Sequence, residues 1–202
     1  MHTRFFWPRL HVFYVHYFLV IIAILTLPLA VMAAPSYDKL RSGPKVGSKI
    51  PHNLATQDQT GTKRNFRSIT GKHGLILLFS RSVGWCVYCK AEAVEWNTRL
   101  KDAKALGYNV AIVTYDRVAR SALFSRRQNI KYPILSDTKS KIIRAFGILN
   151  KTHEPGSFAY GIPHPIIFVV GPNGIIKHRF SQGADYSSRP DIDLIFNTLR
   201  KF

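Results

Sequence analysis

Three short, uninterrupted apolar runs limit the folds that this chain can adopt. They occupy residues 75–79 (LILLF), 110–115 (VAIVTY) and 165–170 (PIIFVV). Runs of this length without polar alternation are typical of strands covered on both faces of a sheet. Stretches with helical spacing of apolar residues separate the runs. Strands and helices therefore alternate along this part of the chain.

The end of the chain adds a hairpin and a helix. Pro172-Asn173-Gly174 predicts a tight turn into a strand at residues 175–180. A short strand is expected at residues 132–135 and an amphipathic helix at residues 191–201. Residues 35–72 are polar and rich in turn formers, and no element is assigned to them. This order predicts an α/β fold with a mixed central β-sheet flanked by helices.

The first 34 residues have a different character. Arg4 and Arg9 are the only charges before Asp38, and an apolar stretch at residues 12–30 leads to Ala33 and Ala34. A basic start, an apolar core and small residues are typical of a signal peptide. The stretch is also close to the length of a membrane span, so an N-terminal membrane anchor stays open. Either way, we expect residues 35–202 to be exported, either periplasmic or anchored facing the periplasm.

Cys86 and Cys89 are the only cysteines of the chain. A bond across two intervening residues closes too short a loop to staple a fold, so the pair points to chemistry. The predicted strand at residues 75–79 leads into Cys86, and a helix is predicted to start there. A helix N-terminus favours a thiolate, and Cys89 lies one turn later on the same side. Cys89 can therefore attack a mixed disulfide formed at Cys86.

Other function classes receive less support. A zinc site needs two further ligands, and no histidine lies at the right spacing. The net charge is +18, from 29 basic and 11 acidic residues. The basic residues are scattered, however, and no nucleic-acid-binding signature is present. A solvated basic surface is the simpler explanation, so we expect no nucleic-acid partner and no metal.

The chain resembles the thioredoxin superfamily, and within it the redoxin branch of alkyl hydroperoxide reductases and thiol-specific antioxidants. The resemblance runs from about residue 45 to the end. It is carried by residues 77–90, which include Trp85-Cys86-Val87-Tyr88-Cys89, and by residues 133–137, 143–148 and 160–174. It implies a thioredoxin-like fold and a redox-active disulfide between Cys86 and Cys89, with no other cofactor.

The resemblance also implies a substrate groove. The superfamily places a cis-proline at the start of the strand that faces the cysteines, and Pro165 matches this position. The loop at His164 and Pro165 is then expected beside Cys86, where His164 would tune the sulfurs or donate a proton. Trp85 is expected to shield one side of the sulfur and to offer an apolar surface to substrate.

Two departures from the family pattern concern peroxide chemistry and proton relay. Peroxiredoxins place a hydroxyl residue three positions before the peroxidatic cysteine and a proline four positions before that. Here these positions hold Val83 and Phe79, with Ser82 as an adjacent hydroxyl.

The second departure concerns a buried acid. Thioredoxins carry one six residues before the first cysteine, where this chain has Ser80. Glu92 or Glu95 could replace it, although both are expected on the surface.

Three functions follow in order of preference. The first is a thiol–disulfide oxidoreductase acting on protein or small-molecule thiols with an unidentified electron partner. The second is a peroxiredoxin-like thiol peroxidase with Cys86 as the peroxidatic residue. The third is a Cu(I)-binding assembly factor that uses Cys86, Cys89 and His164, since soft sulfur ligands suit Cu(I).

Overall fold

Strand β3 (Gly74–Phe79) forms the centre of the sheet and buries all six of its residues. Parallel β4 (Tyr108–Thr114) pairs with one edge of β3, and antiparallel β6 (Ile166–Val170) pairs with the other. Neighbours on both edges and helices or loops on both faces explain why these runs lack polar alternation. The computed structural model describes residues 38–51, 53–183 and 185–201, all in one compact unit. The predicted N-terminal segment, residues 1–34, lies outside these residues.

Four further strands complete the sheet of the described residues. They are β5 (Ile134–Ser136), β7 (Ile176–Phe180), β1 (Ala55–Gln57) and β2 (Lys63–Asn65). The order is β2-β1-β5-β4-β3-β6-β7, in which β3, β4 and β5 are parallel and the other pairings are antiparallel. The predicted α/β fold with a mixed central sheet is confirmed.

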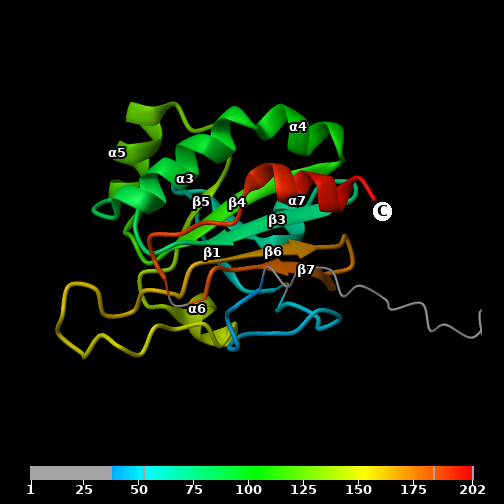
Figure 1. Ribbon diagram of the computed structural model, residues 1–202. Coiled ribbons are helices and arrows are strands. Elements are labelled where there is room, and N and C mark those ends of the chain that lie inside the picture. Colours follow the sequence, from blue (N-terminus) through cyan, green and yellow to red (C-terminus); the bar gives the residue numbers. More distant parts are fainter. Residues whose placement is uncertain (1–37, 52, 184, 202) are drawn as a thin grey trace, which may run out of the picture. The chain divides into compact units, whose positions relative to one another are not determined.

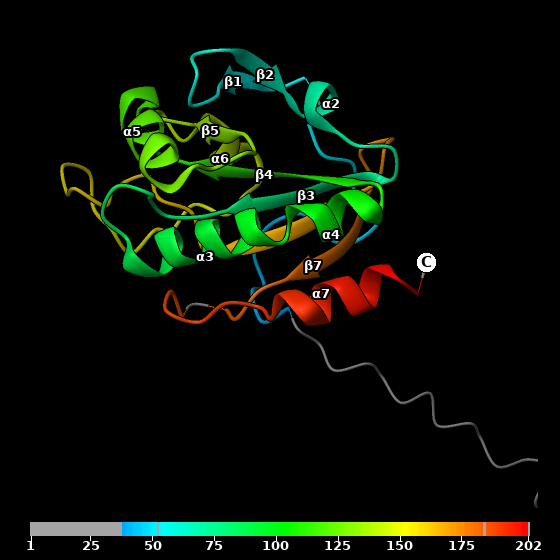
Figure 2. The ribbon, with the colours of Figure 1, turned by 90° about the horizontal axis from the view of Figure 1, so that it is seen from above.

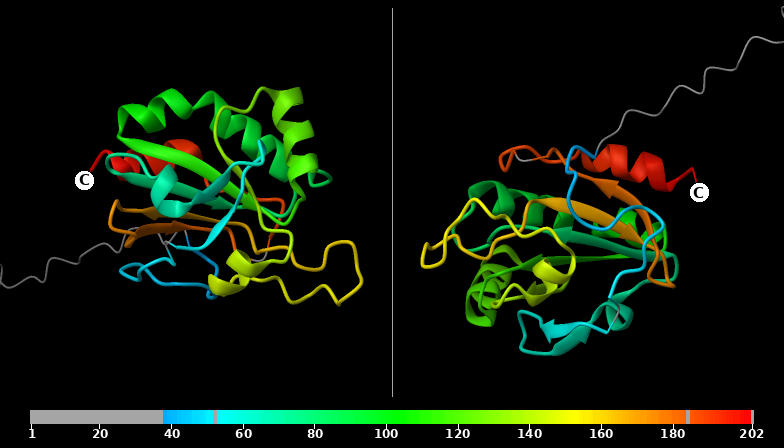
Figure 3. Two further views of the ribbon diagram at one scale, coloured as in Figure 1. Left: turned by 180° about the vertical axis from the view of Figure 1, so that it is seen from behind. Right: turned by 90° about the horizontal axis from the view of Figure 1, so that it is seen from below.

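Helices cover both faces of this sheet (Figure 1). One face carries α3 (Val87–Thr98), α4 (Leu100–Ala105), α5 (Val118–Gln128) and α7 (Ile192–Leu199). The opposite face carries α6 (Lys141–Ala145) and the chain at residues 38–50, as the two views of Figure 3 show. The alternation of β3 divides the core accordingly. Ile76 and Leu78 pack with Trp96, whereas Leu77 and Phe79 pack with Phe146.

Two parts of the chain differ from the prediction. The helix expected after Cys86 is interrupted at Arg99, whose φ of −101° and ψ of 10° separate α3 from α4. Arg99 there forms ion pairs with Asp102 at 2.6 Å and Asp193 at 2.7 Å. Residues 35–72, to which no element was assigned, contain β1, β2 and α2 (Phe66–Ile69), seen beyond β5 in Figure 2. Strands of three residues are too short to show a period.

None of the helices of the described residues is both long enough and apolar enough to cross a bilayer.

Candidate active site

Cys86 and Cys89 lie at the start of α3, the helix that follows β3 in the chain. Cys86 is the N-cap residue of α3, with an extended backbone, and its Sγ accepts a hydrogen bond from the Cys89 N–H at 3.3 Å. The two sulfurs are joined in a disulfide. Cys86 is 4% exposed and Cys89 is fully buried. Cys86 therefore sits at the positive end of the helix dipole, and it is the more exposed of the two cysteine residues.

A buried carboxylate shapes the loop that precedes Cys86. Asp116 accepts hydrogen bonds from the Ser82 hydroxyl and from the Val83 N–H, both at 2.7 Å. Burial raises the pKa of Asp116, and these hydrogen bonds oppose the shift. The Ser82 oxygen in turn accepts the Gly84 N–H at 2.9 Å and the Trp85 N–H at 3.3 Å. The Ser82 hydroxyl is thus buried and fully engaged, so it cannot replace the hydroxyl that is missing at Val83.

Trp85 is part of an aromatic surface around the disulfide. Its indole N–H donates to the Tyr115 hydroxyl at 2.8 Å, and that hydroxyl donates to the Phe158 carbonyl at 2.6 Å. The Trp85 ring meets the edge of Phe158 with centroids 5.2 Å apart. Tyr88, between the cysteines, similarly meets Tyr186 at 6.1 Å. Phe158, Tyr88 and Tyr186 are exposed, so an apolar surface borders the disulfide.

Behind the disulfide lies an ionic cluster that the sequence did not predict. Glu92, expected on the surface, is 5% exposed. Its Oε2 accepts a hydrogen bond from the Ser80 hydroxyl at 3.0 Å and pairs with Arg189 Nε at 2.9 Å. Burial raises the pKa of Glu92, while Arg189 and Ser80 oppose the shift. Arg189 also donates to Cys89 Sγ at 3.4 Å. Glu92 lies three residues after the buried Cys89 and so shares its helix face, which is the signal that could have predicted its burial.

A second arginine is buried in the same region. The Arg81 guanidinium lies 4.8 Å from the Trp85 ring centroid and 4.2 Å from that of Tyr186. Burial lowers the pKa of Arg81. Its Nε has no hydrogen-bond partner among the described residues. Cation–π contacts with two rings thus hold this charge beside the disulfide.

The His164-Pro165 loop lies at the expected end of the sheet but differs in detail. The register of Ile166 with Phe79 places this loop beside the chain that leads to Cys86. The His164 N–H donates to the Ile148 carbonyl at 2.8 Å, and the Pro165 carbonyl accepts the Ser181 hydroxyl at 3.3 Å. No cis peptide bond occurs in the described residues, so the cis bond expected before Pro165 is absent. The hydrogen bonds of those residues include none from the His164 ring to either sulfur.

The half-buried His164 makes a testable contribution to stability. Burial lowers its pKa, so the folded protein keeps the ring neutral below the ordinary value of 6.5. The unfolded chain takes up the proton there, and stability from this residue is lost as pH falls below 6.5. We expect urea unfolding to show a larger loss of stability between about pH 7.5 and pH 5.5 for the wild type than for His164→Gln. An equal loss in both proteins would contradict this assignment.

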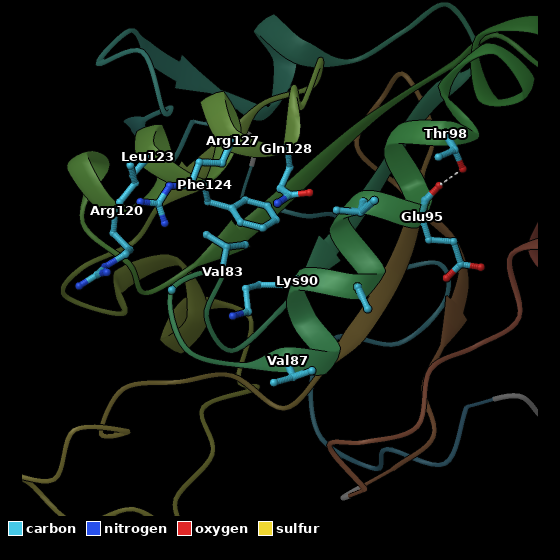
Figure 4. A pocket seen from close by; sticks show the side chains of 13 residues that line it. Val83, Val87, Lys90, Glu95, Thr98, Arg120, Leu123, Phe124, Arg127 and Gln128 are labelled. Atoms are coloured by element: carbon cyan, nitrogen blue, oxygen red, sulfur yellow. Dashed lines mark hydrogen bonds between the residues drawn. The ribbon is translucent and has the colours of Figure 1, made fainter.

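A groove lies between α3 and α5 (Figure 4). Its volume is about 750 Å³. Val83, Gly84 and Val87 form the end near the cysteines, and Leu123 and Phe124 supply apolar lining. Three cationic side chains also line the groove, those of Lys90, Arg120 and Arg127. Glu95 is the lining carboxylate. Neither cysteine lines the groove, although Val87 lies next to Cys86 in the sequence.

Metal ligands are not gathered at this site. Among the described residues, no group of three or more histidine, cysteine, aspartate or glutamate side chains is arranged to hold a metal ion. Cys86 and Cys89 are bonded to each other in this structure.

Comparison with known proteins gives the family. The model of the AhpC/TSA family matches residues 46–179, which contain both cysteines, Glu92 and the His164-Pro165 loop. The chain belongs to the AhpC/TSA family. The redoxin branch of the thioredoxin superfamily, which the sequence motifs indicated, is thereby confirmed. Arg189 lies beyond the matched region.

Two curated relatives show how low the sequence identity to this chain is. Peroxiredoxin bcp1 of Schizosaccharomyces pombe is 27% identical over 103 residues, which cover 51% of this chain and 52% of the relative. Peroxiredoxin Bcp of Xanthomonas campestris is 26% identical over 117 residues, which cover 56% of this chain and 69% of the relative. The chain spans about half the length of the first of these relatives.

Solved structures of AhpC/TSA-like proteins share the fold. Peroxidoxin BcpB from Mycobacterium tuberculosis superposes with a TM-score of 0.63 at 21% identity, covering 78% of this chain and 97% of that one. A PrxQ mutant from Xylella fastidiosa gives a TM-score of 0.65 at 18% identity, covering 78% and 96%. At these identities the likeness supports the fold and carries no residue roles.

Proposed function

We propose that this protein is a thiol peroxidase in which Cys86 attacks a hydroperoxide and Cys89 resolves the product. The observation that carries the proposal is the Cys86–Cys89 disulfide at the N-terminus of α3 within an AhpC/TSA fold. The relatives are named peroxiredoxins, which supports the peroxidase over general disulfide exchange.

The proposed cycle has three steps. The Cys86 thiolate attacks one peroxide oxygen, so an S–O bond forms, the O–O bond breaks, and the alkoxide leaves as an alcohol after taking a proton. The Cys89 thiolate then attacks the Cys86 sulfenic sulfur, forming the disulfide and releasing hydroxide, which is protonated to water. An external dithiol finally reduces the disulfide and is itself oxidised.

The hydroxyl that peroxiredoxins use to polarise the peroxide must be replaced, because Val83 has none. The first N–H groups of an α-helix have no acceptor within the helix. In α3 the Cys89 N–H already points at Cys86 Sγ. We propose that the N–H groups of Val87 and Tyr88, in the same turn, bind the peroxide oxygen that becomes negative.

Disulfide exchange with a protein or small thiol remains a second candidate. The absent hydroxyl at Val83 and the buried Glu92 behind Cys89 favour it. The third candidate, a Cu(I)-binding assembly factor, has no such support.

From residues 1–34 alone, we further propose that the domain works outside the cytoplasmic membrane and receives electrons from a dithiol protein there.

Rates of oxidation by two classes of substrate separate the candidates. The full chain is reduced, and its oxidation by hydrogen peroxide, by cumene hydroperoxide and by oxidised glutathione is followed through tryptophan fluorescence, since Trp85 adjoins Cys86. We expect the better hydroperoxide to react at least about tenfold faster than the disulfide, which corresponds to about 1.4 kcal/mol of activation free energy. A faster reaction with oxidised glutathione would favour disulfide exchange instead.

A further inference from the structure

The chain between β7 and α7 places the guanidinium of Arg189 against Cys89, the more buried of the two cysteines. In Figure 2 this chain runs from β7 back to the start of α7. Arg189, in this part of the chain, donates from Nη2 to Cys89 Sγ at 3.4 Å. The Arg189 side chain is 13% exposed. Arg189 therefore supplies a largely buried positive charge in direct contact with a reacting atom.

Every other polar contact of this guanidinium fixes its position. Nε pairs with Glu92 Oε2 at 2.9 Å, and Nη1 donates to the Tyr186 carbonyl at 2.6 Å and to the Ser188 carbonyl at 2.8 Å. Two of these acceptors belong to the same part of the chain as Arg189 itself. The side chain is thus held in place before the chemistry begins, and ordering it costs little when Cys89 changes state.

The Arg189 guanidinium and Cys89 Sγ are poorly matched while Cys89 is part of the disulfide. A disulfide sulfur is a weak, neutral acceptor, whereas a thiolate carries a full negative charge at the same point. We propose that Arg189 is a catalytic residue that holds reduced Cys89 as the thiolate, ready to attack Cys86. The proposal rests on the proposed function only in assigning the resolving step to Cys89.

Glu92 competes with Cys89 for the same guanidinium. Glu92 stays ionised when Cys89 loses its proton to solvent, so the S–H bond breaks, water takes the proton, and two anions then share one guanidinium. Other groups around the cluster keep their charge: Arg81, which repels Arg189, stays positive, and burial raises the pKa of Tyr132, which stays neutral. The ionisation of Cys89 is therefore set by the balance between Arg189 and Glu92.

This balance predicts effects of opposite sign. The full chain with Cys86→Ser keeps one cysteine, Cys89, whose thiolate is titrated by ultraviolet absorbance. In this background Arg189→Met should raise the pKa of Cys89 by roughly 1–3 pH units, because an opposite charge in contact has been removed. Arg189→Lys should raise the pKa of Cys89 less than Arg189→Met does, because lysine keeps a positive charge. Glu92→Gln should lower the pKa of Cys89, because the guanidinium then serves the thiolate alone.

A purely structural role for Arg189 gives a different pattern. Ser187→Ala removes the hydroxyl hydrogen bond to Asp185 in this part of the chain but keeps Arg189 and Arg81 with their contacts, and it should leave the pKa of Cys89 unchanged. An unchanged pKa in Arg189→Met would overturn the proposal. If Arg189→Met does not fold, Glu92→Gln decides, and an unchanged or higher pKa there overturns the proposal equally. No peroxide is used, so failure of the peroxidase assignment is measured separately.

Discussion

Replacing Cys86 by serine should abolish hydroperoxide turnover, with a loss of at least about 10³-fold in kcat/KM. A serine hydroxyl at the same N-cap position is a far weaker nucleophile than a thiolate at neutral pH. Cys86 is also the cysteine residue that retains some exposure, whereas Cys89 is fully buried. The measurement is steady-state peroxide consumption by the reduced full chain with a dithiol donor.

Cys89→Ser is the matched control for this prediction. It keeps the attacking thiol but removes the resolving one, so one equivalent of peroxide should still be consumed while disulfide formation within the chain is lost. If Cys86→Ser retained turnover and Cys89→Ser lost the first equivalent, the roles of the two sulfurs would be reversed.

Replacing Arg179 by methionine should lower the free energy of unfolding by about 3 kcal/mol. The Arg179 side chain is 6% exposed and pairs with Asp38 at 2.9 Å. Its guanidinium also donates to backbone carbonyls of the preceding chain; the acceptors are Leu40, Ser42, Gly43 and Pro44. The variant leaves these groups without their donor and frees residues 38–44 from β7.

Urea unfolding of the full chain measures this loss, with Arg126→Met as the control. Arg126 is exposed near the end of α5, and surface substitutions of this kind usually change stability by less than about 0.5 kcal/mol. Equal stability of the two variants would show that the Arg179 contacts contribute nothing measurable.

The central sheet could be predicted because each of its main strands has a distinctive local sequence. The runs that became β3, β4 and β6 are continuous and apolar, and the cysteines follow β3 directly. The position of Cys86 at a helix start followed from this order alone. The hairpin of β6 and β7 was equally visible, because Pro172-Asn173-Gly174 marks its turn.

The charged side chains of the site could not be predicted, because their partners are distant in sequence. Glu92 meets Arg189 across 97 residues, and neither position carries a local signal of that contact. Arg179 was counted with the scattered basic residues and is buried by carbonyls more than 130 residues away. The interpretation of the basic charge as a solvated surface is therefore wrong for Arg179 and Arg189.

The peroxidase assignment depends most directly on which sulfur meets the peroxide. The reduced Cys89→Ser full chain is treated with one equivalent of hydrogen peroxide in the presence of dimedone and is then analysed by peptide mass spectrometry. We expect a dimedone adduct on Cys86, the trapped sulfenic acid, in near-stoichiometric yield. Unmodified Cys86, in a protein that still forms a mixed disulfide at Cys86 with oxidised glutathione, would contradict the peroxidase assignment.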